Sequence, residues 1–244
     1  MKQNFQNLDQ FEYWNLIREI GSFNDKWEDS VATKSEIFNR LIKSLDQNSI
    51  TILFPRFNPI ALHLAKTYSV SVIGPAELRT IFDMTNIKLY PSIDAVSQKY
   101  DVVLALDEYF TFAVDEQDQR NKLEEMSKLT SGWLITTLQD YKNFAPHKKN
   151  QIEAVAINSE HNYIMLENSI ADKKDKQLWY HYWCCIKDHN ELLNFGPSTR
   201  RTMYFKQLAK YSSDVGSKQY VIQKNLLYKG FFSKMFEHII TVNF

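Results

Sequence analysis

The sequence predicts an α/β protein built on a doubly wound, mainly parallel sheet with helices on both of its faces. Between residues 50 and 138, short apolar runs alternate with stretches of helical periodicity, which is the pattern of consecutive β-α-β units. One run, residues 101–106, is apolar without a break after its first residue, as expected of a central parallel strand that is buried on both faces.

Two amphipathic helices are expected before the sheet. Residues 8–20 and residues 30–45 each place apolar side chains near helical spacing. In the second stretch these side chains are Ile37, Phe38, Leu41, Ile42 and Leu45. Together the two stretches predict an amino-terminal helical cap over residues 1–48.

The alternation of apolar runs and helical stretches then defines the elements of the sheet in chain order. Strands are expected at residues 50–54, 70–73, 87–90, 101–106 and 132–138, and helices at residues 58–67, 93–98 and 115–129. The last of these helices starts with acidic residues, which favour the amino terminus of a helix.

The carboxyl-terminal part of the chain is less regular. We expect an antiparallel pair at 152–157 and 163–166, an aromatic-rich strand at 178–186, a capped helix at 198–211, and closing strands at 220–232 and 236–244. A helix is an alternative for residues 226–235. Since no linker or repeat divides the chain, residues 49–244 are predicted to form one α/β domain with antiparallel strands at its carboxyl-terminal edge and an insertion at about 151–197.

Composition and charge exclude several classes of protein. The 29 Lys and Arg residues balance the 29 Asp and Glu residues, so no overall field attracts the chain to nucleic acid or membranes. The six glycines lie at least fourteen residues apart. Phosphate-binding loops need glycines a few residues apart so that the backbone can approach the phosphate. P-loop NTPases and ordinary dinucleotide-binding enzymes are therefore excluded.

The two cysteines, Cys184 and Cys185, are adjacent and give no disulfide framework. His181 and His189 lie close to them in the sequence, but no second pair of zinc-ligand spacing accompanies them, and a strand would point the two thiols to opposite sides. A core strand is favoured and no metal site is predicted. The polar start of the chain and the lack of a long apolar stretch predict a soluble, cytoplasmic protein with no membrane partner.

Polar residues follow the ends of the predicted strands, where parallel sheets bind ligands. They are Pro55, Arg56, Phe57 and Asn58 after the first strand, Gly74 to Glu77 after the second, Asp107, Glu108 and Tyr109 after the central strand, and Gln139 and Asp140 after the next. Carboxylates suit ribose hydroxyls and an aromatic ring suits stacking. The alternative is that Asp107 and Asn58 only cap helices.

Residues 100–112, the acidic helix that follows them, and residues 131–138 resemble the fourth and fifth motifs of class I S-adenosylmethionine-dependent methyltransferases. The resemblance covers about residues 49–138, and a closing hairpin at 236–244 suits the antiparallel last strands of that family. It implies a Rossmann-like fold, S-adenosylmethionine as cofactor, and methyl transfer by positioning of the acceptor.

The resemblance also implies a set of site residues. Asp107 and Tyr109 would lie at the reaction mouth as catalytic residues, and Glu77 near the ribose. The cofactor-binding residues would be Pro55, Asn58, Gly74, Glu77, Asp94 and Asp107. The first motif of the family is a glycine-rich turn, whereas residues 54–59 contain no glycine. A second hypothesis is therefore a catalytically inactive binding or assembly subunit that kept the sheet.

Residues 198–236 carry eight basic residues against the single acid Asp214. Arg200, Arg201, Lys206 and Lys210 alternate with aromatic residues, which indicates a surface for nucleic acid and suggests nucleic acid as the methyl acceptor. Two alternatives stay open. The aromatic residues can be the core face of a helix with solvated lysines opposite, or the basic face can dock an acidic protein surface, including another copy of this chain in a homo-oligomer or larger assembly.

Overall fold

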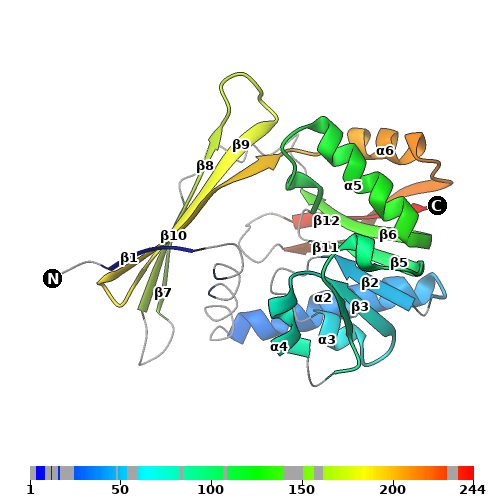
Figure 1. Ribbon diagram of the computed structural model, residues 1–244, viewed down its shortest axis with the longest axis horizontal. Helices are drawn as coiled ribbons and strands as arrows, with labels where there is room; N and C mark the ends of the chain where they lie inside the picture. Colours follow the sequence, from blue (N-terminus) through cyan, green and yellow to red (C-terminus); the bar gives the residue numbers. More distant parts are fainter. Residues whose placement is uncertain are drawn as a thin grey trace.

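The computed structural model describes residues 4–8, 12, 16, 25–47, 49–53, 60–82, 85–106, 109–139, 151–156, 162–229 and 236–244. The described strands form two sheets. A seven-stranded sheet has the order β11-β12-β6-β5-β2-β3-β4, and a five-stranded sheet has the order β1-β10-β9-β8-β7. Figure 1 shows the two sheets on opposite sides of the molecule.

The seven-stranded sheet is mainly parallel, as predicted. Its strands are β2 (Ser49–Leu53), β3 (Ser69–Ile73), β4 (Lys88–Tyr90), β5 (Tyr100–Ala105), β6 (Thr130–Gln139), β11 (Gln219–Lys229) and β12 (Phe236–Asn243). The five strands from β2 to β6 run parallel to one another. Strand β12 lies antiparallel between β6 and β11. The antiparallel carboxyl-terminal edge is thereby confirmed, and residues 226–229 are strand rather than helix.

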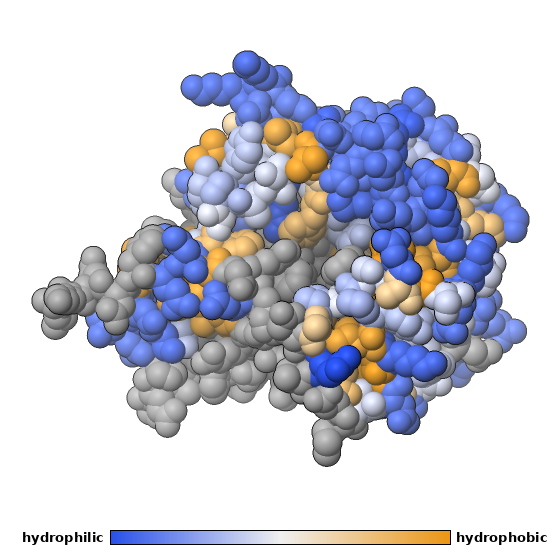
Figure 2. Space-filling model, viewed as in Figure 1, coloured by the Kyte–Doolittle hydropathy of each residue, from blue (hydrophilic) through white to orange (hydrophobic). Residues whose placement is uncertain are grey.

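Helices cover both faces of this sheet. They are α2 (Asp25–Ser44), α3 (Ile60–Leu64), α4 (Arg79–Phe82), α5 (Glu116–Leu129) and α6 (Phe205–Asp214), with single helical turns η1 (Ala76–Leu78), η2 (Ile93–Ala95) and η3 (Tyr109–Thr111). Buried side chains of α2, α3 and α4 belong to one hydrophobic cluster, and those of α5 and α6 belong to the other. The exposed side of α5 is polar, and Figure 2 shows it as a hydrophilic patch. The doubly wound arrangement is confirmed.

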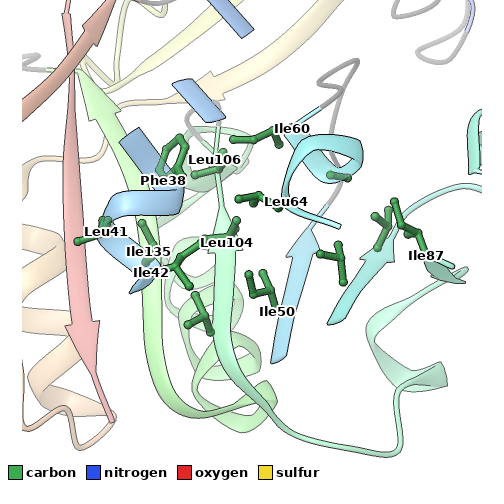
Figure 3. Packing of buried hydrophobic residues seen from close by; sticks show 14 of the residues in the cluster. Phe38, Leu41, Ile42, Ile50, Ile60, Leu64, Ile87, Leu104, Leu106 and Ile135 are labelled. Atoms are coloured by element: carbon green, nitrogen blue, oxygen red, sulfur yellow. The ribbon is translucent and has the colours of Figure 1, made fainter. Parts of the chain in front are cut away.

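The central strand is buried on both faces, as its uninterrupted apolar run predicts. Val102 and Leu104 belong to the cluster under α2 and α3, whereas Val103 and Ala105 belong to the cluster under α5, and all four are fully buried. Figure 3 shows Phe38 of α2 next to Leu106 in the first cluster, which also contains Leu104 and Ile135. Burial of such apolar surface is the main term that stabilises the fold.

Strands β2 and β5 lie side by side and run parallel, with Ile50 paired to Val102. Their amino ends are fastened by side chains: the backbone N–H and the hydroxyl of Ser49 donate to Asp101 Oδ2 at 3.0 and 2.7 Å. The backbone N–H of Asp101 donates in turn to Ser49 Oγ at 3.0 Å. These bonds fix the register, so the two chains leave the sheet together at its carboxyl edge.

The five-stranded sheet consists of β1 (Asn4–Asn7), β7 (Gln151–Ala156), β8 (Asn162–Ala171), β9 (Leu178–Lys187) and β10 (Glu191–Arg201). The predicted antiparallel pair is present as β7 and β8, and the aromatic run is β9. Cys185 is fully buried and Cys184 is half-buried, and both are free thiols. The domain boundaries at residues 48, 151 and 197 stay predictions.

Three helix predictions need correction. Residues 4–7 form a strand paired parallel to β10, and the N–H of Leu8 donates to Asn194 O at 2.7 Å, so no helix begins at Leu8. Glu12 and Leu16 are helical, and Phe11 and Ile20 lie outside the described residues. The helix predicted at 198–211 begins only at Phe205, because residues 198–201 pair with β9 as the end of β10. The helix at 93–98 is reduced to the single turn η2.

In the described ranges, no helix is both long and apolar enough to cross a membrane.

Candidate functional site

The winding of the seven-stranded sheet reverses between β2 and β5. The connections from β2 to β4 place Ile60, Leu64 and Phe82 on one face of the sheet. The connections from β4 to β6 place Ile93 and Leu123 against the other face. In open parallel sheets, ligands bind beyond the carboxyl ends of the strands at such a reversal. The candidate site is therefore the edge where β2 and β5 end.

Gly74 and residue 77 lie at this edge, directly after β3. The N–H of Gly74 donates to Tyr90 O at 2.9 Å, which extends the pairing of β3 and β4. A Cβ at Gly74 would lie 2.6 Å from Leu78 Cδ1, so packing against Leu78 explains this glycine. Glu77 belongs to the turn η1, and its side chain is outside the described residues.

Asp94 follows the neighbouring strand β4. It lies in the turn η2, its side chain is exposed, and the residue before the turn, Ser92, makes no side-chain cap bond. Because β3 and β4 are paired neighbours, the backbones at residues 77 and 94 both emerge at the same edge of the sheet. Two carboxylates of the predicted set therefore follow adjacent strands there.

Tyr109 lies in the turn η3, four residues after the end of β5. Its ring meets the ring of Phe110 edge to face, with 5.6 Å between ring centroids, and it packs against the cluster under α5. Burial raises the pKa of the Tyr109 hydroxyl well above its usual value, and the carboxylates of Glu125 and Asp118 add to the shift. The phenol therefore stays protonated at neutral pH, where it can donate a hydrogen bond but cannot act as a general base.

Three predicted site residues, Pro55, Asn58 and Asp107, lie outside the described residues. The structure does show where their strands end. Ile52 of β2 is paired with Leu104 of β5, one residue before each strand stops. The described ends of β2 and β5 therefore lie next to each other.

The four predicted nucleic-acid contacts do not form one exposed face. Arg200 and Arg201 lie in β10 rather than on a helix and are 7% and 8% exposed. The guanidinium of Arg201 forms an ion pair with Asp175 and donates to Gln177 Oε1 at 3.1 Å. Lys206 and Lys210 are exposed on α6. Residues 198–201 pair with β9, and this pairing buries the two arginines. On α6, Tyr211 packs into the core, which favours the alternative that the aromatic residues form the core face of this helix and the lysines its solvated side.

The Asp175–Arg201 pair predicts a specific dependence of stability on pH. Hydrogen bonds from the Arg201 guanidinium and from the N–H of Gln177 hold the pKa of Asp175 below its usual value. A carboxyl whose pKa is lowered by folding stabilises the protein above its unfolded pKa of about 3.9, and this contribution is lost as the pH falls through the folded pKa. Between about pH 5 and pH 2, the urea midpoint should therefore fall more in the native protein than in Arg201→Gln.

Lys206→Gln is the matched control, because it removes one positive charge from an exposed position of α6. Its urea midpoint should fall with pH as steeply as that of the native protein. An equal fall in Arg201→Gln would contradict the pairing.

Gln119 is a residue of the site region that the sequence pattern could have revealed. It shares the buried side of α5 with Leu123 and Met126, at helical spacing. Its side-chain amide lies 3.2–3.3 Å from the carbonyl oxygens of Phe110, Arg201 and Thr202. A polar residue within the apolar side of a helix indicates a buried hydrogen bond of this kind. The side chain of Gln119 thereby connects α5 to η3 and to the end of β10.

Several solved structures share the fold of this chain. No protein-family model and no curated protein sequence matches the chain. An amino pentose methyltransferase from Micromonospora echinaspora, solved with S-adenosylmethionine bound, is similar with a TM-score of 0.68 at 12% identity, over 97% of this chain and 98% of that one.

Two further solved structures are similar over most of both chains. A sugar N-methyltransferase from Streptoalloteichus sp. gives a TM-score of 0.68 at 10% identity, over 87% of each chain. An S-adenosylmethionine-dependent methyltransferase from Clostridium acetobutylicum gives 0.61 at 12% identity, over 87% of this chain and 91% of that one. The resemblance noted in the sequence is confirmed at this level: the chain has the Rossmann-like fold of class I S-adenosylmethionine-dependent methyltransferases.

Proposed function

We propose that this protein transfers a methyl group from S-adenosylmethionine to a small-molecule acceptor. The observation that carries the proposal is the likeness over nearly the whole length of both chains to the amino pentose methyltransferase, which was solved with that cofactor. The reversal of winding between β2 and β5 supports it, because this is where an open parallel sheet binds ligands.

The residues that follow the strands fit the cofactor in chemical type. Glu77 and Asp94 follow adjacent strands, and carboxylates accept hydrogen bonds from ribose hydroxyls. Asn58 and Pro55 follow β2, and Asp107 follows β5. When bound, S-adenosylmethionine supplies an activated methyl group on a sulfonium. The protein then has to position the acceptor in line with it and exclude water.

Tyr109 and Asp107 take different parts in this proposal. Because the Tyr109 hydroxyl stays protonated, it orients the acceptor by donating a hydrogen bond. Asp107 then serves as the carboxylate that receives the proton the acceptor loses as its nitrogen or oxygen gains the methyl group.

A small molecule is the acceptor class that the similar structures support. These structures include an amino pentose methyltransferase, a sugar N-methyltransferase and a 1,6-didemethyltoxoflavin-N1-methyltransferase. The burial of Arg200 and Arg201 removes the argument for a nucleic-acid acceptor. An amine or hydroxyl on a small molecule is therefore the group we expect to be methylated.

Calorimetric titration with S-adenosylhomocysteine tests the donor site. We expect a dissociation constant in the micromolar range, about −8 kcal/mol, since a formed pocket is required for such affinity. Glu77→Ala should weaken binding about tenfold by removing the ribose acceptor. Glu124→Ala is the control, since this exposed carboxylate of α5 pairs only with Lys128 among the described residues. It should bind like the native protein.

A specific observation favours one second candidate. Residues 54–59 have no glycine where the fold's donor turn usually has several. If binding is undetectable at millimolar cofactor, the protein is instead a binding or assembly subunit that has kept the sheet without the donor site.

A further inference from the structure

The five-stranded sheet is apolar on both of its faces. On one face, Met165 of β8, Cys185 of β9 and Leu193 of β10 lie opposite one another and belong to a buried cluster. Side chains alternate between the two faces of a strand, so the next residue along each strand points to the other side of the sheet. On β8 and β9 that side carries six large apolar residues: Ile164, Leu166, Ile170, Tyr180, Tyr182 and Ile186. We name these six residues the outer sheet face.

The outer sheet face is continuous across the two strands and accessible to solvent. Ile170 lies opposite Tyr180, and Ile164 lies opposite Ile186. Ile170 and Tyr182 are 49% and 39% exposed, and the other four residues are half-buried. An antiparallel sheet that meets water on one side normally carries polar residues there. A contiguous apolar patch on a surface instead marks a place where another molecule binds.

The helices of the chain are packed elsewhere. Buried side chains of α2 to α6 belong to the two clusters on either face of the seven-stranded sheet, and Figure 1 shows these helices gathered around that sheet. The exposure of Ile170 and Tyr182 remains with these helices in place. A cover for the outer sheet face therefore has to come from a second molecule.

The lack of charge on this side of the sheet selects the partner. The outward positions of β8 from 164 to 170 and of β9 from 178 to 186 carry no Asp, Glu, Lys or Arg. Surfaces that bind membranes carry Lys and Arg beside their apolar residues, and surfaces for charged proteins carry the opposite charge. A flat apolar sheet fits another flat apolar sheet, about 10 Å away. A second copy of this chain offers such a sheet, and its net charge of zero means that two copies do not repel each other.

The size of the sheet suits a stable dimer. Its strands are 4 to 11 residues long. Each strand residue occupies roughly 3.3 by 4.8 Å, so the five strands cover about 650 Å² in projection. Protruding side chains make the accessible area larger than the projection, and a standard interface buries about 800 Å² on each partner. We propose that two copies of this chain pack their outer sheet faces together as a symmetric dimer. This inference goes beyond the proposed methyl transfer and does not depend on it.

Sedimentation-velocity centrifugation of the full chain tests the inference. The native protein should be a dimer at concentrations of tens of micromolar, because interfaces of this size have dissociation constants of micromolar or below. Ile170→Lys and Tyr182→Lys should each raise the dimer dissociation constant about a hundredfold, because a symmetric interface would then bury two unpaired charges. Both side chains are exposed in the single chain, so the variants should keep the native circular dichroism spectrum.

Val114→Lys is the matched control. Val114 is 61% exposed and lies after the turn η3, outside the five-stranded sheet. The substitution adds the same charge in place of an exposed apolar residue. This variant should dimerise like the native protein.

The thiol of Cys184 gives a second measurement, on the native protein. Cys184 is half-buried and lies opposite Leu166, so it belongs to the outer side of β9, whereas the neighbouring Cys185 is fully buried on the other side. A dimer covers Cys184. Its reaction with a maleimide should therefore be slower, per molecule, in a concentrated sample than after dilution to the monomer. Cys184→Ser should remove the reaction.

Three outcomes would overturn the inference. The first is a native protein that sediments as a monomer at hundreds of micromolar. The second is a dimer that persists unchanged in both lysine variants, or a Cys184 reaction rate that does not depend on protein concentration, because another surface would then join the copies. The third is a monomer that binds phosphatidylcholine vesicles and loses this binding in Ile170→Lys, because the outer sheet face would then meet a lipid surface.

Discussion

Phe38→Ala is expected to lower the free energy of unfolding by about 3–5 kcal/mol. Phe38 is fully buried and packs from α2 onto the face of the sheet that holds Ile50 and Leu104, as Figure 3 shows. Truncation loses the transfer free energy of the ring and leaves a cavity that strands β2 and β5 cannot close without moving. Urea unfolding followed by circular dichroism measures the change.

Glu36→Ala is the matched control for this prediction. Glu36 lies two residues away on the exposed side of α2, where it pairs with Arg40 at 3.7 Å with both side chains largely solvated. Such a pair contributes at most about 0.5 kcal/mol. If Phe38→Ala changed stability no more than Glu36→Ala does, α2 would not be packed on the sheet as described.

The parallel sheet could be predicted from the sequence because its signal is local. Residues 102–106 are an unbroken apolar run, and such a run is expected of a strand that is buried on both faces. The start of α5 could also be predicted from its acidic residues. Asp115 caps the amino terminus of this helix, since its Oδ1 accepts a hydrogen bond from the N–H of Asp118 at 2.7 Å. Each of these signals lies within the element that it predicts.

The errors occur where a distant partner decides the structure. Residues 4–7 have three polar side chains and a single apolar one, Phe5, which is too little for a strand pattern, and they form β1 because they pair with the edge of β10. Ser198 is a good helix cap by type, yet residues 198–201 continue β10 because β9 pairs with them. Tertiary pairing overrides local propensity in both places.

The candidate site was predictable only as a position. The carboxyl ends of β2 and β5 lie side by side because the two strands pair, so this edge of the sheet could be predicted from the order of the strands. The protonated state of Tyr109 does not follow from the sequence, because it depends on burial and on carboxylates of a helix that packs against it.

Gln119→Leu is expected to lower the free energy of unfolding by about 2 kcal/mol, because buried carbonyl oxygens lose a donor at a cost of about 1–3 kcal/mol each. The amide of Gln119 is shared among the carbonyls of Phe110, Arg201 and Thr202, and Gln119 is fully buried. The buried and unpartnered Oε1 of Gln119 is removed by the same change, which offsets part of the loss. Urea unfolding measures the effect.

The same substitution should also loosen the contact between the two sheets, since Phe110 belongs to η3 and Arg201 ends β10. Gln117→Leu is the control, because Gln117 lies on the exposed side of α5 and its amide donates only to Asn121 Oδ1 among the described residues, at 2.8 Å. It should change stability by less than about 0.5 kcal/mol. In Gln119→Leu, the amides of residues 199–203 should exchange hydrogen faster than in the control, because local opening of the β10 end becomes easier. Equal exchange in the two variants would show that Gln119 does not hold the end of β10 against α5.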